Sequence, residues 1–221
     1  MHLRFQIMSR WWFVAALPCA AALSVAPCAR PHPMARHHPM MLTQDSQLVE
    51  VAKTRLLAAC QAAAGGRDVE RRASVLACIE EVEALNPTPQ PLACPKLLSG
   101  CWRLVYTTSD SILGTARQRP FKPDYTRILQ SIDAEKLAAK NEEWVLGGLL
   151  KNQVRAELTP REDGKTVDVQ FKRFGIGWLR VPAPASARGV LETTFLDDSL
   201  RISRGDKGNL FCLVRVGASR V

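Results

Sequence analysis

The sequence has very little histidine, and all of it lies at one end of the chain. Among 221 residues there are four histidines, His2, His32, His37 and His38. Histidine is the commonest general base in enzymes and a common metal ligand. Without its first 41 residues the chain has none, which excludes a Ser-His-Asp or Cys-His catalytic site from the remainder.

The cysteines lack the spacing of a metal site. None of the seven forms a C-x-x-C pair, so we expect no zinc site and no metal. Five follow residue 41, and an odd number disfavours a full disulfide framework. Cys94 and Cys101 are close enough in sequence to pair under oxidation. Free thiols in a reducing compartment are the favoured interpretation.

Other catalytic signatures are also missing. Paired carboxylates occur at Glu142-Glu143, Glu162-Asp163 and Asp197-Asp198, but adjacent residues of a strand point to opposite faces and make no acid/base pair. The segment Gly205-Asp206-Lys207-Gly208 lacks the spacing of a phosphate-binding loop. We therefore expect no enzyme activity and no cofactor.

The charge is positive and unevenly distributed. The net charge is +9, and residues 96–221 hold 21 basic and 14 acidic side chains, whereas residues 42–95 hold five and seven. A basic surface can attract nucleic acid, anionic lipid or an acidic protein. No basic run interleaved with stacking aromatics occurs, so we expect no nucleic-acid partner.

The C-terminal part has the clearest pattern. Apolar residues alternate with others at 200–202 and 210–216, and the joints are Asp197-Asp198-Ser199 and Gly205-Asp206-Lys207-Gly208. Both joints have turn-forming compositions. Residues 191–216 are therefore predicted to form three strands of a meander that closes a sheet.

Two segments carry a family pattern. Residues 196–211 read LDDSLRISRGDKGNLF, and residues 97–108 read LLSGCWRLVYTT. They resemble the C-terminal signature and the first-strand motif of the plastid lipid-associated proteins, also called plastid fibrillins, and the resemblance extends from about residue 48 to residue 216. The signature positions, taken as structural, are Gly100, Trp102, Asp197, Arg201, Arg204, Gly205, Asp206, Gly208, Asn209 and Arg215.

Residues 1–41 are predicted to be a signal plus transit-type targeting segment. Arg4 and Arg10 precede an apolar run that ends in small residues, and the stretch that follows is basic without any acid. This order suggests delivery to a plastid bounded by extra membranes. Secretion and an uncleaved N-terminal anchor are the alternatives.

Residues 42–95 are predicted to form a helical hairpin followed by a proline-rich linker. In the first helix Leu48, Ala52, Leu56, Ala59 and Ala63 share a face, and Gly65-Gly66 ends it. Asp68 would cap a second helix whose face is formed by Val69, Ala73, Leu76, Ile79 and Val82. We expect the pair to plug or cover one end of the sheet. Docking to a partner or to a membrane surface is the alternative.

Residues 96–221 are predicted to form a lipocalin-like up-and-down β-barrel, which makes the fold mainly β with N-terminal helices. The expected strands are 99–107, 125–133, 142–146, 149–158, 166–174, 189–195, 200–204 and 210–216, with residues 109–124 as a loop or short helix over the open end. Gly100-Cys101-Trp102 resembles the lipocalin GxW motif. That resemblance implies that Arg215 lies over the Trp102 ring.

Candidate cavity or lipid contacts are Tyr106, Trp144, Phe174, Trp178 and Arg204. Residues 171–181 are predicted to be a bent barrel strand with its apolar residues in the core, and an apolar tip that enters lipid between basic anchors is the alternative. Arg201 and Arg204 should face opposite sides of their strand. The favoured role of the signature arginines is pairing with Asp197 or Asp206 across the hairpin, and the alternative is that one of them enters the cavity mouth.

The resemblance implies binding or sequestration of hydrophobic plastid metabolites of carotenoid, prenylquinone, tocopherol or fatty-acid type. The expected place is the thylakoid or plastoglobule surface, with the protein associated peripherally. The alternative is a structural coat of lipid droplets, or an accessory subunit with a protein partner in prenyl-lipid synthesis.

Overall fold

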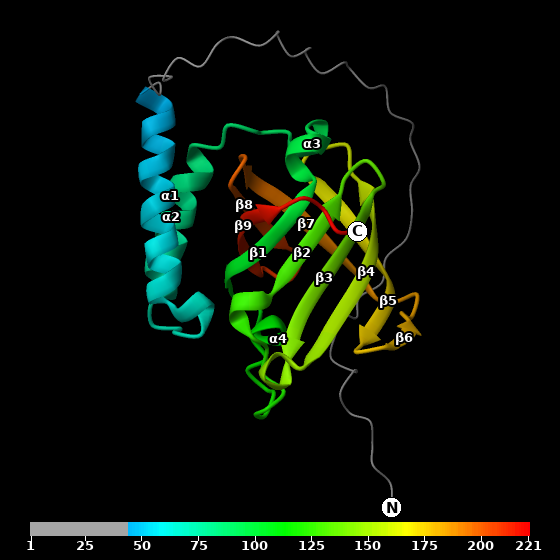
Figure 1. Ribbon diagram of the computed structural model, residues 1–221. Helices are drawn as coiled ribbons and strands as arrows, with labels where there is room; N and C mark the ends of the chain where they lie inside the picture. Colours follow the sequence, from blue (N-terminus) through cyan, green and yellow to red (C-terminus); the bar gives the residue numbers. More distant parts are fainter. Residues whose placement is uncertain (1–43) are drawn as a thin grey trace, which may run out of the picture.

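The structure, a computed structural model, describes residues 44–221. The predicted targeting segment, residues 1–41, lies outside the described residues. The described chain forms two helices beside an antiparallel β-barrel (Figure 1).

The helical hairpin is confirmed. Helices α1 (Gln44–Ala62) and α2 (Arg72–Ala84) lie side by side and are joined through the short turn η1 (Ala64–Gly66). Gly66 has a φ of 108°, and a Cβ at this position would collide with the carbonyl oxygen of Thr107. Glycine therefore allows the turn to contact the first barrel strand.

The predicted start of the second helix is wrong. Asp68 does not cap α2, which begins four residues later. Instead, the Asp68 carboxylate accepts a hydrogen bond from the backbone N–H of Glu70 and pairs with Arg71. Val69 is 65% exposed. The buried face of α2 consists of Val75, Ile79 and Val82.

Eight antiparallel strands form a closed barrel, which confirms the predicted fold class. They are β1 (Gly100–Thr107), β2 (Leu129–Asp133), β3 (Ala138–Val145), β4 (Leu150–Pro160), β5 (Thr166–Ile176), β7 (Arg188–Leu196), β8 (Leu200–Gly205) and β9 (Leu210–Gly217). Neighbours pair in this order, β4 pairs with β5, and β9 pairs back to β1. Each predicted strand overlaps one of them.

One strand lies outside the barrel. Strand β6 (Leu179–Pro182) pairs with the end of β5, and the chain turns between them at Gly177, which has a φ of 57°. This hairpin projects beyond the barrel wall (Figure 1). The expectation that residues 171–181 form one bent barrel strand with its apolar residues in the core is wrong beyond Ile176, because Trp178 is 91% and Leu179 47% exposed.

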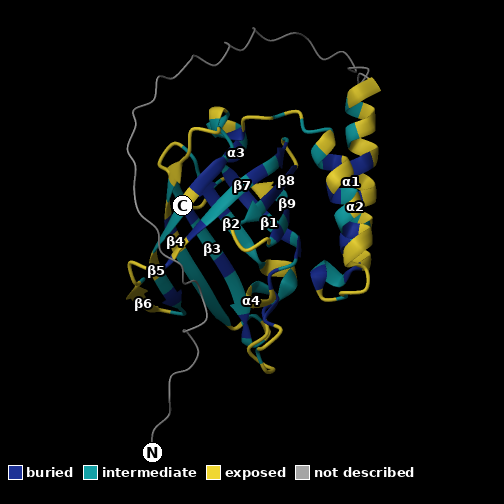
Figure 2. Cartoon of the chain, turned by 180° about the vertical axis from the view of Figure 1, so that it is seen from behind, coloured by how far each residue is buried: buried dark blue, intermediate teal, exposed yellow. Residues whose placement is uncertain are grey.

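The molecule has two hydrophobic cores. One lies between the helices and the outer wall of β1, β7, β8 and β9, and it includes Leu56, Ile79, Phe195, Ile202 and Cys212. The other fills one part of the barrel around Trp102, Leu196 and Leu213. Figure 2 shows the buried positions of the helices on their barrel-facing side. The hairpin therefore covers the side of the barrel, and the prediction that it covers an end is wrong.

The expected linker, residues 86–95, has more structure than an extended chain. It contains the turn η2 (Pro91–Ala93) and continues into the short helix α3 (Pro95–Leu98). The backbone N–H of Leu92 donates to the carbonyl oxygen of Gly164, between β4 and β5. The opposite end of the barrel carries α4 (Asp110–Leu113), η3 (Tyr125–Arg127) and η4 (Leu146–Gly148).

Candidate functional site

The inner face of the barrel follows from the strand register. Residues directly opposed on neighbouring strands share a face. Gln130 is opposite Asn141, Asn141 is opposite Val154, and Val154 is opposite Phe174. The Arg201 side chain of β8 reaches Gln130 of β2 from the other side of the barrel. These residues therefore face the interior.

Only one aromatic candidate from the sequence faces inward. Phe174 does, and its ring centroid lies 6.4 Å from that of Phe171. Trp144 lies on the outer face, where the Arg127 guanidinium carbon is 5.2 Å and the Lys151 Nζ 5.8 Å from its ring centroid. Trp178 projects into solvent.

Tyr106 belongs to the core under the helices. The register of β1 against β9 shifts between Leu104 and Tyr106, as in a β-bulge. Before the shift, Trp102 and Leu104 pack inside the barrel, and after it Tyr106 packs with the helices. The bulge therefore removes Tyr106 from the set of inward-facing residues.

Trp102 contacts two arginines. Its indole N–H donates to the Leu98 carbonyl oxygen at 3.1 Å. The Arg215 guanidinium carbon lies 4.1 Å from the ring centroid, as the GxW resemblance implies, and that of Arg201 lies 5.1 Å away. Each cation over an aromatic face contributes about 0.5 to 2 kcal/mol. Gly100 is required here, because a Cβ would collide with the Arg215 guanidinium.

The structure places Arg201 inside the barrel. The sequence alone assigns this residue only a structural role. It is 1% exposed, and its Nη2 donates to Gln130 Oε1. Its Nε and Nη1 have no hydrogen-bond partner, and no described acidic side chain forms an ion pair with it. Burial and the charge of Arg215 lower the pKa of Arg201 to about 9. The group therefore stays charged at neutral pH.

A buried charge of this kind is expensive. An ion removed from water without a counter-charge costs several kcal/mol, and each unpaired buried donor adds about 1 to 3 kcal/mol. Arg201 and Ser203 alternate with the apolar Ile202 along the strand, and this pattern is the sequence signal that could have indicated an inward-facing arginine. Alternation does not say which of the two faces is inside.

Arg204 faces the helices. It pairs with Glu83 of α2 through Nη2 at 2.6 Å and Nε at 3.0 Å. The Asp197 carboxylate accepts from the backbone of Leu200 and from Nζ of Lys53 on α1, each at 2.6 Å. The prediction that a signature arginine pairs with Asp197 or Asp206 across the hairpin is wrong for Arg204 and for Asp197, because α2 supplies the partner of Arg204 and α1 supplies that of Asp197.

A lid covers the end of the barrel away from Trp102. It consists of residues 109–124 and includes α4. The Tyr125 hydroxyl donates to the Leu113 carbonyl oxygen at 2.7 Å, and Arg117 pairs with Glu143 of β3 at 2.7 Å. The Arg67 guanidinium lies 4.0 Å from the Tyr125 ring centroid, which connects the helical hairpin to the base of the lid.

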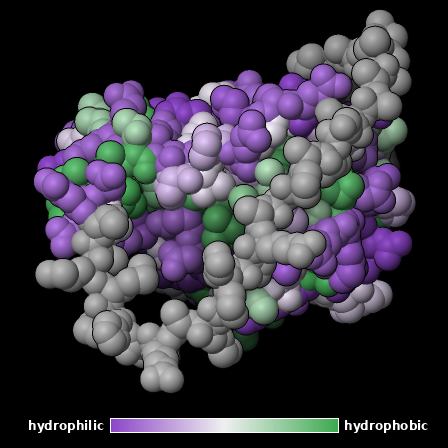
Figure 3. Space-filling model, turned by 90° about the horizontal axis from the view of Figure 1, so that it is seen from above, coloured by the Kyte–Doolittle hydropathy of each residue, from purple (hydrophilic) through white to green (hydrophobic). Residues whose placement is uncertain are grey.

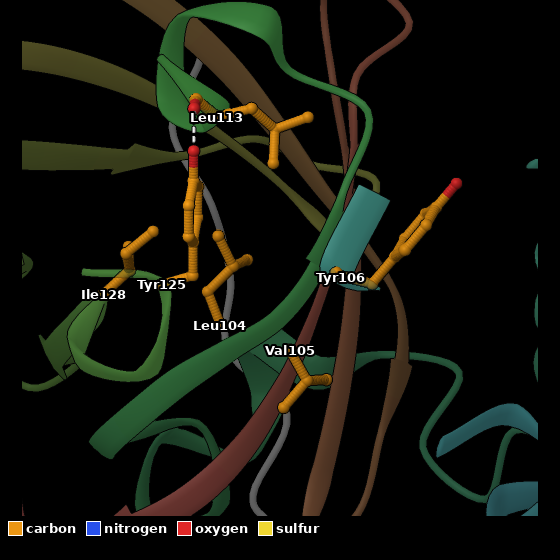
Figure 4. Close-up of a pocket in the computed structure, with 7 residues that line it drawn as sticks. Leu104, Val105, Tyr106, Leu113, Tyr125 and Ile128 are labelled. Atoms are coloured by element: carbon orange, nitrogen blue, oxygen red, sulfur yellow. Dashed lines mark hydrogen bonds between the residues drawn. The ribbon is translucent and has the colours of Figure 1, made fainter. Parts of the chain in front are cut away.

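A small cavity lies under the lid (Figure 4). Its volume is about 20 Å³, and it lies where the lid, β1 and the turn of the helical hairpin meet. Its lining consists of Gly65, Leu104, Val105, Tyr106, Leu113, Tyr125 and Ile128. Tyr125 points toward Leu113, whereas Tyr106 points away from both. A cavity of this size holds about one water molecule.

Exposed apolar side chains surround the lid end, and we call them the rim. The rim consists of Phe121 (48% exposed), Leu149 (91%), Trp178 (91%), Leu179 (47%) and Val181 (38%). Backbone hydrogen bonds connect the three segments that carry them, from Leu146 N–H to Pro120 O and from Gly177 N–H to Lys151 O. The end of the molecule opposite the lid is mostly hydrophilic where it is visible, with separate hydrophobic areas (Figure 3).

The rim segments are also basic. Residues 114–123, 145–151 and 171–182 contain three, one and three basic side chains and no acidic one. Tryptophan prefers the interface between lipid and water, and arginine and lysine bind anionic headgroups. This combination fits a lipid surface better than it fits water.

Some kinds of site are not found between residues 44 and 221. No group of three or more histidine, cysteine or acidic side chains could hold a metal ion there. No helix in this range is long and apolar enough to span a bilayer. Cys60, Cys78, Cys94, Cys101 and Cys212 are all free thiols, so the pair considered for Cys94 and Cys101 is not formed.

Comparisons with known proteins agree with the geometry. The family model described as PAP_fibrillin matches residues 50–181 and 178–214, well over half of the chain. A probable plastid-lipid-associated protein 5, chloroplastic, of Arabidopsis thaliana is 42% identical over 142 residues, which are 62% of this chain and 56% of that protein. No solved structure matches.

Two further relatives cover slightly more of the chain. A probable plastid-lipid-associated protein 3, chloroplastic, of Arabidopsis thaliana is 31% identical over 68% of this chain and 53% of its own length. A chromoplast-specific carotenoid-associated protein of Cucumis sativus is 28% identical over 68% of this chain and 62% of its own. The chain therefore spans little more than half the length of these curated relatives.

Proposed function

Since the chain belongs to the PAP/fibrillin family of plastid lipid-associated proteins, we propose that it binds or sequesters hydrophobic plastid metabolites at a lipid surface. The proposed ligands are of carotenoid, prenylquinone, tocopherol or fatty-acid type, and the proposed surfaces are thylakoids or plastoglobules. The printed names of relatives, which include plastid-lipid-associated, carotenoid-associated and plastoglobulin, support this range. The role is non-catalytic.

The observation that carries the proposal is the rim next to the lid. An exposed patch of large apolar side chains marks an interaction surface, and this one lies between basic side chains. A protein resting on lipid through the rim would present its lid to the source of the ligand. The ligand could then pass between lipid and barrel without crossing water.

The barrel supplies the driving force. Inward side chains of β4 and β5, including Val154 and Phe174, are only partly buried and offer apolar contact. Burying some 300 Å² of ligand at about 25 cal/mol per Å² would favour binding by about 7 kcal/mol before entropic costs. If the lid must open for binding, the free energy of the contacts that break reduces this favourable free energy of binding.

The experiment is vesicle flotation of the full chain. Leu149→Glu and Trp178→Glu each place a charge at a rim position that is 91% exposed, so neither should disturb the fold. We expect each variant to reduce the fraction that floats with anionic vesicles several-fold. Leu48→Glu is the matched control, because Leu48 is 52% exposed on α1 at the far end of the molecule. Equal flotation of all four proteins would refute the role of the rim.

A structural coat or accessory subunit is the second candidate. The small cavity and the large inward Trp102, Phe171 and Phe174 favour it, because filled barrels hold no ligand. Native mass spectrometry of the full chain purified from plastid-containing cells separates the two. A stoichiometric apolar molecule supports the carrier, and an empty protein that still floats with vesicles supports the coat.

A further inference from the structure

The interior of the barrel contains a cation for which no residue between 44 and 221 supplies a counter-charge. Arg201 is buried, makes one side-chain hydrogen bond, to Gln130, and leaves Nε and Nη1 without partners. Gln130 is itself held, because its amide nitrogen donates to Asn141 Oδ1 at 3.0 Å. Its oxygen is thereby turned toward Arg201. The guanidinium has a defined position and two nitrogen atoms whose donors are unused.

A purely structural role does not account for this arrangement. Arg215 already provides the cation over Trp102 and is held by the carbonyl oxygens of Ser99, at 2.8 Å, and Leu97. A second cation near the same ring adds repulsion between the two guanidinium groups. An apolar side chain of similar size would fill the same space without losing hydration.

The surroundings of Arg201 continue toward the lid. Arg201 is opposite Leu213 on β9, and Leu213 is opposite Leu104 on β1. Leu104 lines the small cavity under the lid (Figure 4). Trp102, whose ring lies next to Arg201, packs in one cluster with Ile112 of the lid and with Ile128, so a molecule with an anionic group at Arg201 would meet apolar side chains on the inner face as far as the lid.

We propose that Arg201 binds the carboxylate of a long-chain amphipathic ligand, whose chain lies along the inner face of the barrel toward the lid. This inference rests on the proposed function and narrows the range of proposed ligands to those that carry a carboxylate. The carboxylate supplies the missing counter-charge and accepts from the unpaired N–H groups. Neutral lipids of the same length would gain the apolar contacts and leave these donors unpaired.

The test compares two probes that differ in one group, oleate and oleyl alcohol, by calorimetric titration of the full chain. We expect wild-type protein to bind oleate about tenfold to a hundredfold more tightly than oleyl alcohol, as one charge-assisted hydrogen bond predicts. Arg201→Met should remove this preference and leave the affinity for oleyl alcohol unchanged. Its melting temperature without ligand should be equal or higher, which a structural arginine would not show.

Arg204→Met is the matched control, because Arg204 lies on the same strand and faces α2. It should keep the preference for oleate. If wild-type protein binds both probes equally, the carboxylate site is refuted while the carrier function stands. If it binds neither probe, the carboxylate site is refuted and the fatty-acid type is removed from the proposed ligands, while the native mass spectrometry described above still tests the carrier function. The comparison of the two probes on wild-type protein needs no variant to fold.

Discussion

Arg201 and Arg204 lie three residues apart on β8 and face opposite sides of the barrel wall. Arg204 reaches Glu83 on α2, and Arg201 reaches Gln130 across the interior. The alternation of side chains along a strand predicted that the two arginines face opposite sides. It could not predict which side was inside, because that depends on where the helices dock. The more exposed arginine therefore has an acidic partner, while the buried one has none among the described residues.

Asp197 is the second residue whose environment has a measurable consequence. Burial opposes its ionisation, but hydrogen bonds from Lys53 and from the backbone of Ser199 and Leu200 outweigh burial and lower the pKa of Asp197. A lowered pKa in the folded state stabilises the protein above the unfolded pKa, near pH 4. This stabilisation is lost as the pH falls through the lower, folded value.

We therefore predict that Asp197→Asn lowers the free energy of unfolding at pH 7 by about 1 to 3 kcal/mol. The variant should also lose less stability than wild-type protein between pH 5 and roughly pH 2. Urea denaturation across this range measures both effects. Asp206→Asn, in the exposed turn between β8 and β9, is the control and should match wild-type protein. A parallel pH dependence of all three proteins would contradict the assignment.

Among the elements, the lid covers the end of the barrel through which a ligand would pass under the proposed function. It is tied to β3 by the pair of Arg117 and Glu143, whose side chains are 25% and 18% exposed. A partly exposed pair of this kind contributes about 1 kcal/mol. The pair is one of several contacts that hold the lid, together with the hydrogen bonds from Tyr125 to Leu113 and from Leu146 to Pro120.

Arg117→Ala should accelerate uptake and release of a barrel ligand several-fold, because the open state becomes more populated. The melting temperature should fall by a few degrees at most. Stopped-flow fluorescence with a fluorescent fatty acid measures the rates. Lys122→Ala removes a charge from the same loop without breaking the pair with Glu143, so it should leave the rates unchanged. Identical rates in the two variants would show that the pair does not hold the lid.

The elements were predictable to different degrees. The eight barrel strands follow from local alternation, which each strand carries in its own residues. Strand β6 was missed because its exposed apolar residues, such as Leu179 and Val181, resemble a buried strand. The outward turn of Tyr106 was missed because a bulge shifts the alternation without changing the composition.

At the scale of the whole molecule, one of the two cores is built jointly by the helices and the outer wall of the barrel. Helix residues such as Leu56 and Ile79 pack directly on barrel residues such as Phe195 and Ile202. The sequence showed an apolar face on each helix, but the location of its partner depends on contacts far apart in the chain. The hairpin was therefore predictable, and its place on the side of the barrel was not.

A shared core predicts a single cooperative unfolding transition for the full chain. The melting temperatures from far-ultraviolet circular dichroism and from tryptophan fluorescence should coincide. A fragment of residues 96–221 should be insoluble or loosely packed, because it exposes the outer wall that the helices bury. A soluble fragment with the melting temperature of the full chain would contradict this prediction.

The two ends of the described chain lie away from the rim. Helix α1 begins at the far end of the molecule, and the Arg220 carbonyl oxygen accepts a hydrogen bond from Lys140 Nζ on the outside of β3. A molecule resting on lipid through the rim thus directs both attachment points toward the aqueous side. A fluorescent protein joined after Val221 would therefore report the position of the protein in a living cell without competing for the proposed lipid surface.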